Sequence, residues 1–233
     1  MPEHGKKYRA LLEKLGDTLT PRSLEEAVSA IKAASPTKFD ATVEVHIRTG
    51  CDPKQADEMI RAITVLPHGT GKSPKIAVFA EESKHKEAKA AGADIVGGED
   101  LIAEVIKGKI DFEVAIATPE MMKSLAKAAK VLGPKGLMPS PKSGTVTDNI
   151  TAAVEDVKKG KIELKLDKDG NVHSVLGKVS FAEKDLLENA KAFFKVLKDA
   201  KPSGIKSIYL QTITLTTTMG PGVRVEVASA LTE

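Results

Sequence analysis

The chain has 233 residues, of which 41% are hydrophobic and 29% charged, and its net charge is +3. This composition is typical of a soluble globular protein with one large domain or two smaller ones, and the low net charge means that nucleic-acid binding would depend on local patches. Cys51 is the only cysteine, which excludes an intramolecular disulfide and a cysteine-based zinc site and fits a reducing cytosol. Neither a signal-peptide pattern nor an apolar run of about 18 residues occurs, so we expect no secretion and no membrane span.

The N-terminal part predicts helices at about residues 8–15 and 24–34, followed by a strand at residues 41–49. Apolar and polar residues alternate strictly along this strand, as they do in a strand with one buried face. The apolar positions are Val43, Val45 and Ile47, and the polar positions are Thr42, Glu44, His46 and Arg48. A single strand of this kind cannot form a sheet, so it needs partners from elsewhere in the chain.

The middle of the chain has a different pattern. Continuous apolar runs at residues 76–80 and 114–117, with a shorter one at 94–98, predict strands that are buried on both faces. Helices are expected between and after them, at residues 81–91, 99–107 and 119–131, the last with Pro119 in its first turn and Thr118 as its cap. This alternation predicts an inserted Rossmann-like three-layer α/β domain at residues 67–158.

The C-terminal part returns to alternating strands. Residues 161–167 and 172–176 flank an Asp169–Gly170 turn and predict a hairpin, and further strands are expected at 212–218 and 223–227, with a helix at 183–198. Strands with one apolar face favour an antiparallel sheet with one wet side. We therefore predict an α/β protein of two domains, in which residues 1–66 and 159–233 form a discontinuous outer α+β domain.

Both chain crossings between these domains contain glycine, which indicates hinges. The predicted hinge residues are Pro67, Gly69, Gly71 and Gly160. Residues 69–73 also resemble the end of a phosphate-binding P-loop, and a nucleotide-dependent enzyme that uses Lys72 is the alternative hypothesis. Leu66 occupies the position where that motif needs its first glycine, so the nucleotide hypothesis is disfavoured.

The loop at residues 133–145 is rich in Gly and Pro and lies in a window, residues 121–147, without any acidic residue. The window contains Lys123, Lys127, Lys130, Lys135 and Lys142. A cationic loop with free backbone N–H groups suits phosphate, and we expect Lys135 and Lys142 to make a secondary RNA or tRNA contact. The alternative is an ordinary solvated basic loop.

The polar faces of the strands form a second candidate site. Thr214, Thr216 and Thr218 share one face of the strand at 212–218, which ends in a Met219–Gly220 turn. Such a face could approach the backbone and 2′-hydroxyl groups of RNA, although strand propensity alone also explains a run of threonines. The scarcity of aromatic residues weighs against single-strand binding by stacking. The five histidines show no metal-site or hydrolase spacing, so we expect no metal, no cofactor and no catalytic residues.

Several motifs together resemble the family of the bacterial large-subunit ribosomal protein L-one, the protein of the mobile rRNA stalk. The resemblance begins at His4 and runs nearly to the end of the chain. The specific segments are KFDATVEVH at 38–46, LPHGTGK at 66–72, GADIVGG at 92–98, ATP at 117–119, residues 132–146, and TTTMGP at 216–221.

The resemblance implies a non-enzymatic protein that is a structural constituent of the large ribosomal subunit, binds 23S rRNA through the outer domain, and helps to release deacylated tRNA from the exit site. It also implies repression of the protein's own operon through mRNA binding. Its partners would be 23S rRNA, exit-site tRNA, its own mRNA and other ribosomal components, and the protein would be cytoplasmic and monomeric when free. With the polar strand faces, the expected rRNA-binding residues are Lys38, Phe39, Thr42, Glu44, His46, Arg48, Thr216, Thr217, Thr218, Met219 and Gly220.

Overall fold

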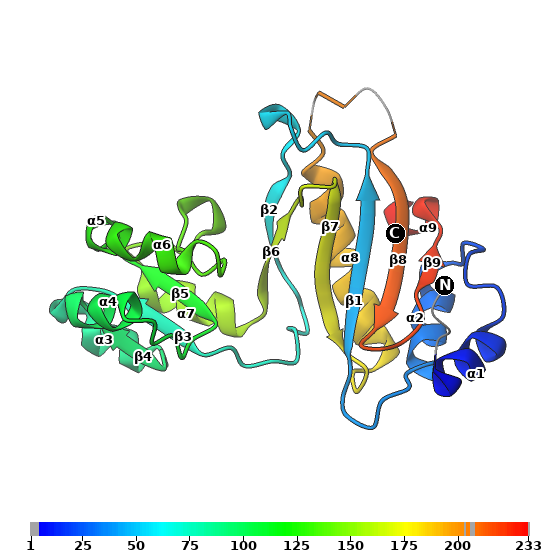
Figure 1. Ribbon diagram of the computed structural model, residues 1–233, viewed down its shortest axis with the longest axis horizontal. Coiled ribbons are helices and arrows are strands. Elements are labelled where there is room, and N and C mark those ends of the chain that lie inside the picture. Colours follow the sequence, from blue (N-terminus) through cyan, green and yellow to red (C-terminus); the bar gives the residue numbers. More distant parts are fainter. Residues whose placement is uncertain (1–4, 203, 206–207, 233) are drawn as a thin grey trace. The chain divides into compact units, whose positions relative to one another are not determined.

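The computed structural model describes residues 5–202, 204–205 and 208–232, so His4, where the resemblance begins, lies outside the described residues (Figure 1). Contacts divide the chain into two compact units. Unit 1 comprises residues 1–71 and 162–233, and unit 2 comprises residues 72–161. The boundaries therefore fall after Gly71 and Lys161, a few residues beyond the positions expected from the sequence.

Unit 1 is built on a four-stranded antiparallel sheet with the strand order β7-β1-β8-β9, beside a two-stranded sheet of β2 and β6. Its strands are β1 (Thr42–Thr49), β2 (Arg61–Val65), β6 (Lys161–Lys165), β7 (Asn171–Lys178), β8 (Leu210–Thr217) and β9 (Val223–Val225). Its helices are α1 (Lys6–Leu15), α2 (Leu24–Ala33), α8 (Glu183–Asp199), α9 (Val227–Thr232) and the short 3-10 turn η1 (Ala56–Glu58). The predicted sheet with strands from both chain ends is confirmed.

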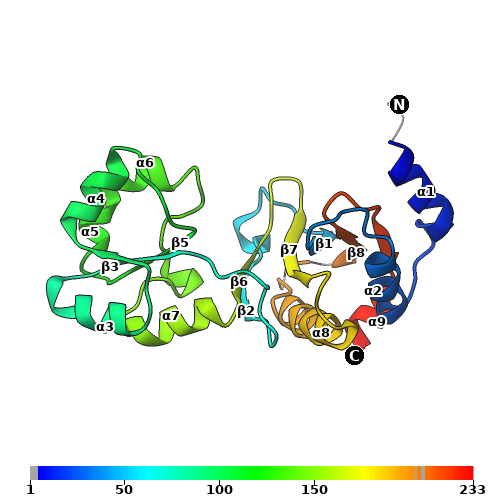
Figure 2. The same ribbon diagram turned by 90° about the horizontal axis from the view of Figure 1, so that it is seen from below.

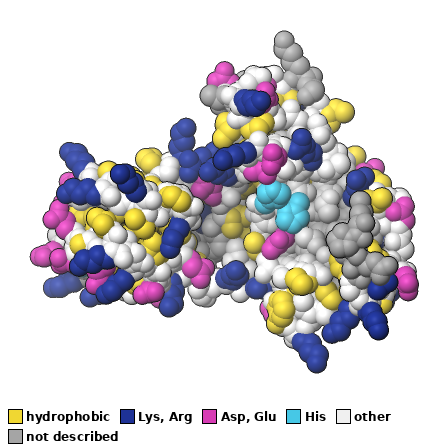
Figure 3. All heavy atoms as spheres, in the orientation of Figure 1, with side chains coloured by type: hydrophobic (Ala, Val, Ile, Leu, Met, Phe, Trp, Pro, Cys, Tyr) yellow, Lys and Arg dark blue, Asp and Glu magenta, His cyan; other side chains and the backbone are white. Residues whose placement is uncertain are grey.

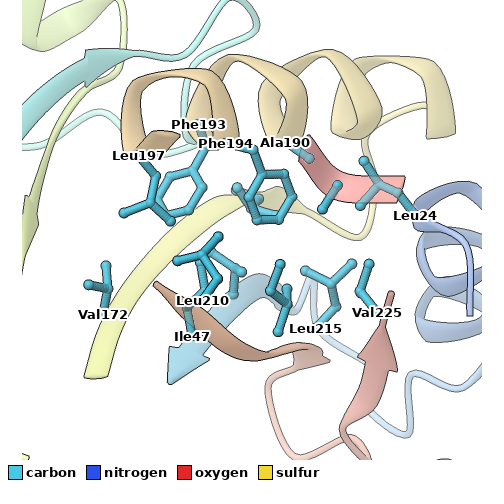
Figure 4. Close-up of a cluster of buried hydrophobic side chains, with 14 of the residues drawn as sticks. Leu24, Ile47, Val172, Ala190, Phe193, Phe194, Leu197, Leu210, Leu215 and Val225 are labelled. Carbon is cyan, nitrogen blue, oxygen red and sulfur yellow. The ribbon is translucent and has the colours of Figure 1, made fainter. Parts of the chain in front are cut away.

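The core of unit 1 lies between this sheet and the helices α2 and α8, as Figure 4 shows. Leu186, Ala190, Phe193 and Leu197 recur at helical spacing along α8 and are fully buried against the strands. Burying a side chain such as Phe193 stabilises the fold by about 1.5–3 kcal/mol. Because the core takes only alternate residues of β1, the residues between them face away from the core.

The crossing at residues 66–71 is held against α8 by Asn189, which is completely buried. Its Oδ1 accepts the backbone N–H of His68 at 3.0 Å, and its Nδ2 donates to the carbonyls of Gly69 at 3.0 Å and Leu176 at 2.8 Å. Gly69 and Gly71 have φ angles of 67° and 72°, and a Cβ on Gly71 would collide with the side chain of Lys178. This crossing is therefore a packed part of unit 1.

Unit 2 has three layers around a parallel sheet with the strand order β4-β3-β5, and Figure 2 shows helices on both of its faces. Its strands are β3 (Ile76–Phe79), β4 (Ile95–Gly97) and β5 (Val114–Ala117). Its helices are η2 (Glu82–Lys84), α3 (His85–Ala90), α4 (Glu99–Ile106), α5 (Met122–Leu125), η3 (Ala126–Ala128), α6 (Ala129–Leu132), η4 (Pro141–Ser143) and α7 (Ile150–Lys158). Alternate residues of β3 enter the two apolar layers: Ala77 and Phe79 pack with α4 to α6, and Ile76 and Val78 pack with α3 and α7. The predicted three-layer α/β architecture is confirmed.

The predicted hairpin of residues 161–176 is wrong, although its turn exists. The carboxylate of Asp167 accepts the backbone N–H of Asp169 at 2.9 Å, and one bridge joins Leu166 to Val172. Beyond this bridge the strands separate, because β6 pairs with β2 and β7 pairs with β1. No strand was predicted at β2, so β6 had no other partner in the expected topology.

Two further expectations need correction. The helix expected at 119–131 begins only at Met122, lacks a side-chain cap and is interrupted by the 3-10 turn η3, while the hydroxyl of Thr118 is buried without a partner among the described residues. The strand expected to reach Val227 ends at Val225, and α9 begins at Val227. The helices α7 and α9 were not predicted.

Candidate nucleic-acid interface

The exposed face of the four-stranded sheet carries the polar residues predicted on β1 and β8. Cross-strand register places Glu44 opposite Thr216, His46 opposite Thr214, and Arg48 opposite Thr212. Figure 3 shows histidine and acidic side chains close together on this part of the surface. The Arg48 guanidinium is anchored at the end of the sheet, where it donates to the carbonyl of Asp169.

At the other end of this face, the end of β8 is tied to the start of β1. Thr218 donates its backbone N–H to the carbonyl of Thr42 at 3.0 Å, and its hydroxyl oxygen accepts the backbone N–H of Thr42 at 3.1 Å. Lys178 of β7 donates to the hydroxyl of Thr42 at 3.0 Å. This cation was not predicted, because the expected strand ended at Val175–Leu176; extending the alternation by two residues would have included it.

The turn that follows β8 presents Met219 to solvent in a strained conformation. Gly220 donates its backbone N–H to the carbonyl of Thr217 at 2.8 Å, and Met219, with a φ of 66°, is the only non-glycine residue with positive φ in the described part of the chain. The Met219 side chain is 75% exposed, whereas Thr217 is buried under the turn. A Cβ on Gly220 would collide with the Thr217 hydroxyl. Thr217 and Gly220 therefore shape the turn, while Met219 projects from it.

An open groove of about 620 Å³ lies beside this turn. It is lined by Gly5, Lys6, Lys7, Tyr8, Pro36, Thr37, Phe39 and Met219. Phe39 is 58% exposed, and neighbouring Lys38 is also exposed. Exposed aromatic and thioether side chains next to lysines can receive the apolar faces of a nucleotide while the lysines face its phosphate.

The imidazoles of His46 and His173 meet on the same face, between the carboxylates of Glu44 and Asp167. The two Nδ1 atoms are 2.8 Å apart. The pKa of His46 lies below its ordinary value, chiefly because partial burial disfavours the cation and because charge on His173 opposes it, while Glu44 acts in the opposite direction. His173 was not among the predicted site residues; its place opposite His46 becomes evident only when β7 is paired with β1.

The basic loop of unit 2 differs from its prediction in one respect. Most of its backbone N–H groups donate within the loop or to the preceding helix; these are the amides of Gly133, Gly136, Leu137, Ser140, Lys142, Ser143, Gly144 and Thr145. They are therefore not available as a phosphate-binding nest. The side chains of Lys135 and Lys142 are exposed, so any contact with phosphate would depend on them.

The alternative nucleotide site finds no support in the geometry, and Cys51 does not form a nucleophilic site. Residues 72–75, which include the end of the P-loop-like segment, form no helix and lead directly into β3, whereas a P-loop needs a helix N-terminus at this point. Cys51 is buried, and this burial raises the pKa of its thiol, which is the opposite of what a nucleophile requires.

Within the described ranges, no three His, Cys, Asp or Glu side chains are arranged to hold a metal ion. Among the same residues, no helix has the length and apolar character of a membrane span.

A sequence model of the ribosomal protein L1p/L10e family matches residues 31–221, which is most of the 233-residue chain. The match includes β1, β7, β8 and the Met219 turn of unit 1 and the whole of unit 2, and it ends before β9. The resemblance inferred from the motifs is thereby confirmed. The chain belongs to the ribosomal protein L1p/L10e family, a family of structural, non-enzymatic ribosomal proteins that bind rRNA.

Proposed function

We propose that the protein binds 23S rRNA in the large ribosomal subunit through the exposed sheet face of unit 1 and the turn at residues 217–220. The observation that carries this proposal is the convergence of three kinds of group at one end of the sheet. Hydroxyls come from Thr42 and Thr218, a cation from Lys178, and exposed apolar side chains from Phe39 and Met219.

These groups match the chemistry of folded RNA. Hydroxyls can donate hydrogen bonds to, and accept them from, 2′-hydroxyl groups and base edges, and the Glu44 carboxylate can only accept them. Lysines attract phosphates. Phe39 and Met219 pack against ribose or an exposed base beside the groove. The strain held at Met219 supports this assignment, because strained backbone is concentrated at functional sites.

The proposed rRNA-binding set keeps the residues expected from the sequence and adds Lys178. Within it, Thr217 and Gly220 act by holding the turn, and Lys38 contributes charge beside the groove. In unit 2, Lys135 and Lys142 make a secondary contact with RNA or tRNA in the assembled ribosome. Of the predicted hinge residues we keep Gly160, which has a φ of 96°. Pro67, Gly69 and Gly71 belong to the segment that is packed against α8, so we propose residues 72–75 as the other hinge in their place.

In the cytoplasmic ribosome, this arrangement would serve the mobile stalk that helps to release deacylated tRNA from the exit site. The same RNA-binding face would recognise a similar structure in the protein's own mRNA and repress its translation. The free protein would be a monomer that folds without a cofactor. Each of these roles depends on the same selective contact with folded RNA.

The proposal is tested by measuring the affinity of the purified protein for a 23S rRNA stalk fragment and for a scrambled hairpin of the same composition. We expect the stalk fragment to bind at least tenfold more tightly. A repression assay with the protein's own leader mRNA then tests the regulatory role, because the same variants should lose binding to both RNAs. If mRNA binding survives in variants that no longer bind rRNA, the two RNAs use different surfaces.

A further inference from the structure

The contact between His46 and His173 constrains how many protons the two rings can carry. Their Nδ1 atoms are 2.8 Å apart, and the ring centroids are 5.0 Å apart at an interplanar angle of 62°. A hydrogen bond between two ring nitrogens needs one N–H and one lone pair, so at least one imidazole must be neutral while the contact exists. The intact pair therefore carries a charge of zero or +1, and a charge of +2 would break it.

The outer nitrogen of each ring faces a carboxylate. His173 Nε2 lies 3.2 Å from Asp167 Oδ2, and His46 Nε2 lies 3.6 Å from Glu44 Oε2. On β8, the neutral Thr214 lies opposite His46. Arg48 lies two residues from His46 on the same face of β1, where it donates to the backbone carbonyl of Asp169 and to the side-chain oxygen of Asn171 at 3.3 Å, and Arg224 of β9 lies opposite Thr214.

The carboxylates of Glu44 and Asp167 lie on the face that is proposed to bind RNA, which is a polyanion. RNA phosphates near Glu44 and Asp167 would add to the negative potential, and a negative potential favours the protonated form of a nearby imidazole. A proton taken up by the histidine pair would offset the repulsion between these carboxylates and the RNA phosphates, and no side chain would have to move. In the absence of RNA, burial and mutual repulsion keep the pKa of His46 below its ordinary value, so near neutral pH the proton is not yet bound there.

We propose that RNA binding to this face is coupled to the uptake of one proton by the His46–His173 pair, so that affinity for RNA rises as the pH falls from about 8 to about 6. This inference rests on the proposed function. Its sign follows from linkage: the bound state holds the proton more tightly than the unbound state, so lowering the pH favours the bound state. One proton gives at most about a tenfold gain in affinity for each pH unit, between the titration points of the two states.

The test compares RNA affinity at constant ionic strength at about pH 6, 7 and 8, because histidine changes its charge in this range. The variants are His46→Gln and His173→Gln, which keep polar side chains but cannot take up a proton. His85→Gln is the matched control, because His85 lies in unit 2 and its Nε2 contacts the carbonyl of Ala80 at 3.0 Å. We expect the wild-type protein and the control to gain about threefold to tenfold in affinity for each pH unit, and both pair variants to lose most of this gain.

Unchanged pH dependence in both pair variants, or its absence from the wild-type protein, would overturn the inference while leaving selective RNA binding intact. A second measurement needs no RNA: an NMR titration of the imidazole protons. His173→Gln should raise the pKa of His46, because it removes the opposing charge of His173. A titration of His46 that does not respond to His173→Gln would refute the shared proton. Failure to select the stalk fragment at any pH would instead refute the proposed function, and proton coupling to RNA with it.

Discussion

Thr218 and Thr42 are joined by a reciprocal pair of hydrogen bonds at the end of the sheet: the amide of Thr218 donates to the Thr42 carbonyl at 3.0 Å, and the Thr218 hydroxyl accepts the Thr42 amide at 3.1 Å. The side chain therefore extends the pairing of β1 and β8 beyond the last strand residue. It fixes the direction in which the chain enters the Met219 turn. Two parts of the proposed RNA site, from opposite ends of the sequence, are held in place by this contact.

Thr218→Val should lower affinity for the stalk fragment by about tenfold, which corresponds to about 1.4 kcal/mol. The valine has a similar shape but cannot accept the Thr42 amide, so the turn loses its support. Thr151→Val is the control, because its hydroxyl also bonds a partner, Glu87 at 3.2 Å, but lies on α7 in unit 2. Fluorescence anisotropy with labelled RNA measures both; an equal loss in the control would argue against a local effect.

Met219→Gly should separate stability from binding. Glycine removes the steric cost of positive φ, about 1–2 kcal/mol, and adds a similar entropic cost in the unfolded chain, about 0.5–1 kcal/mol. We expect the free energy of unfolding to change by less than about 1 kcal/mol while RNA affinity falls at least tenfold, because the exposed thioether side chain is lost. Denaturant titration and RNA binding are measured on the same preparation. Full retention of affinity would remove Met219 from the site.

Asn189→Ala should weaken unit 1 locally around the crossing. It leaves the buried carbonyl of Leu176, and the partly buried amide of His68 and carbonyl of Gly69, without their partner. An unsatisfied buried group costs about 1–3 kcal/mol, so the carbonyl of Leu176 should account for most of the loss. Amide hydrogen exchange should accelerate in this segment. Asn149→Ala, which removes the cap of α7, is the matched control and should cost about 1 kcal/mol within unit 2 only. Unchanged exchange at residues 66–71 would mean that Asn189 does not hold the crossing.

The double change Lys135→Glu and Lys142→Glu should leave binding to the isolated stalk fragment within about twofold, because both lysines belong to unit 2. In assembled ribosomes, the same variant should slow the release of deacylated tRNA. Lys178→Glu is the opposite control and should weaken fragment binding directly. If the double variant and Lys178→Glu lose fragment affinity equally, the unit 2 loop is a primary contact.

The fold could be predicted wherever the hydrophobic period was unambiguous. The alternation around Val45 and the continuous apolar run from Ile76 each predicted the correct kind of sheet, since side-chain burial decides these patterns. The helix α7 carried a readable signal that was missed: Asn149 caps it by accepting the amide of Ala152 at 3.1 Å, and Ile150 begins a helical apolar stripe.

Other features depended on tertiary partners. The pairing of β6 with β2 could not be predicted, because an adjacent turn at Asp169–Gly170 favours a hairpin and the competing strand has only one buried residue, Thr64. In the candidate site, too, some residues could be predicted from the strand pattern and others only from the pairing of strands. Thr42 and Thr218 lie on readable strand faces, whereas the contact of His46 with His173 exists only through the register of β1 and β7.

The central claim is that unit 1 selects a folded ribosomal RNA through its sheet face, and the most direct test is binding to the 23S stalk fragment over a salt series, with the scrambled hairpin in parallel. The account predicts tight, fragment-selective binding whose logarithm falls linearly with the logarithm of salt concentration. Lys178→Ala should reduce that slope by about 0.9, the value for one lost phosphate contact on a duplex. Equally weak binding to both RNAs, with the same slope in wild type and variant, would contradict the claim and leave only a basic surface.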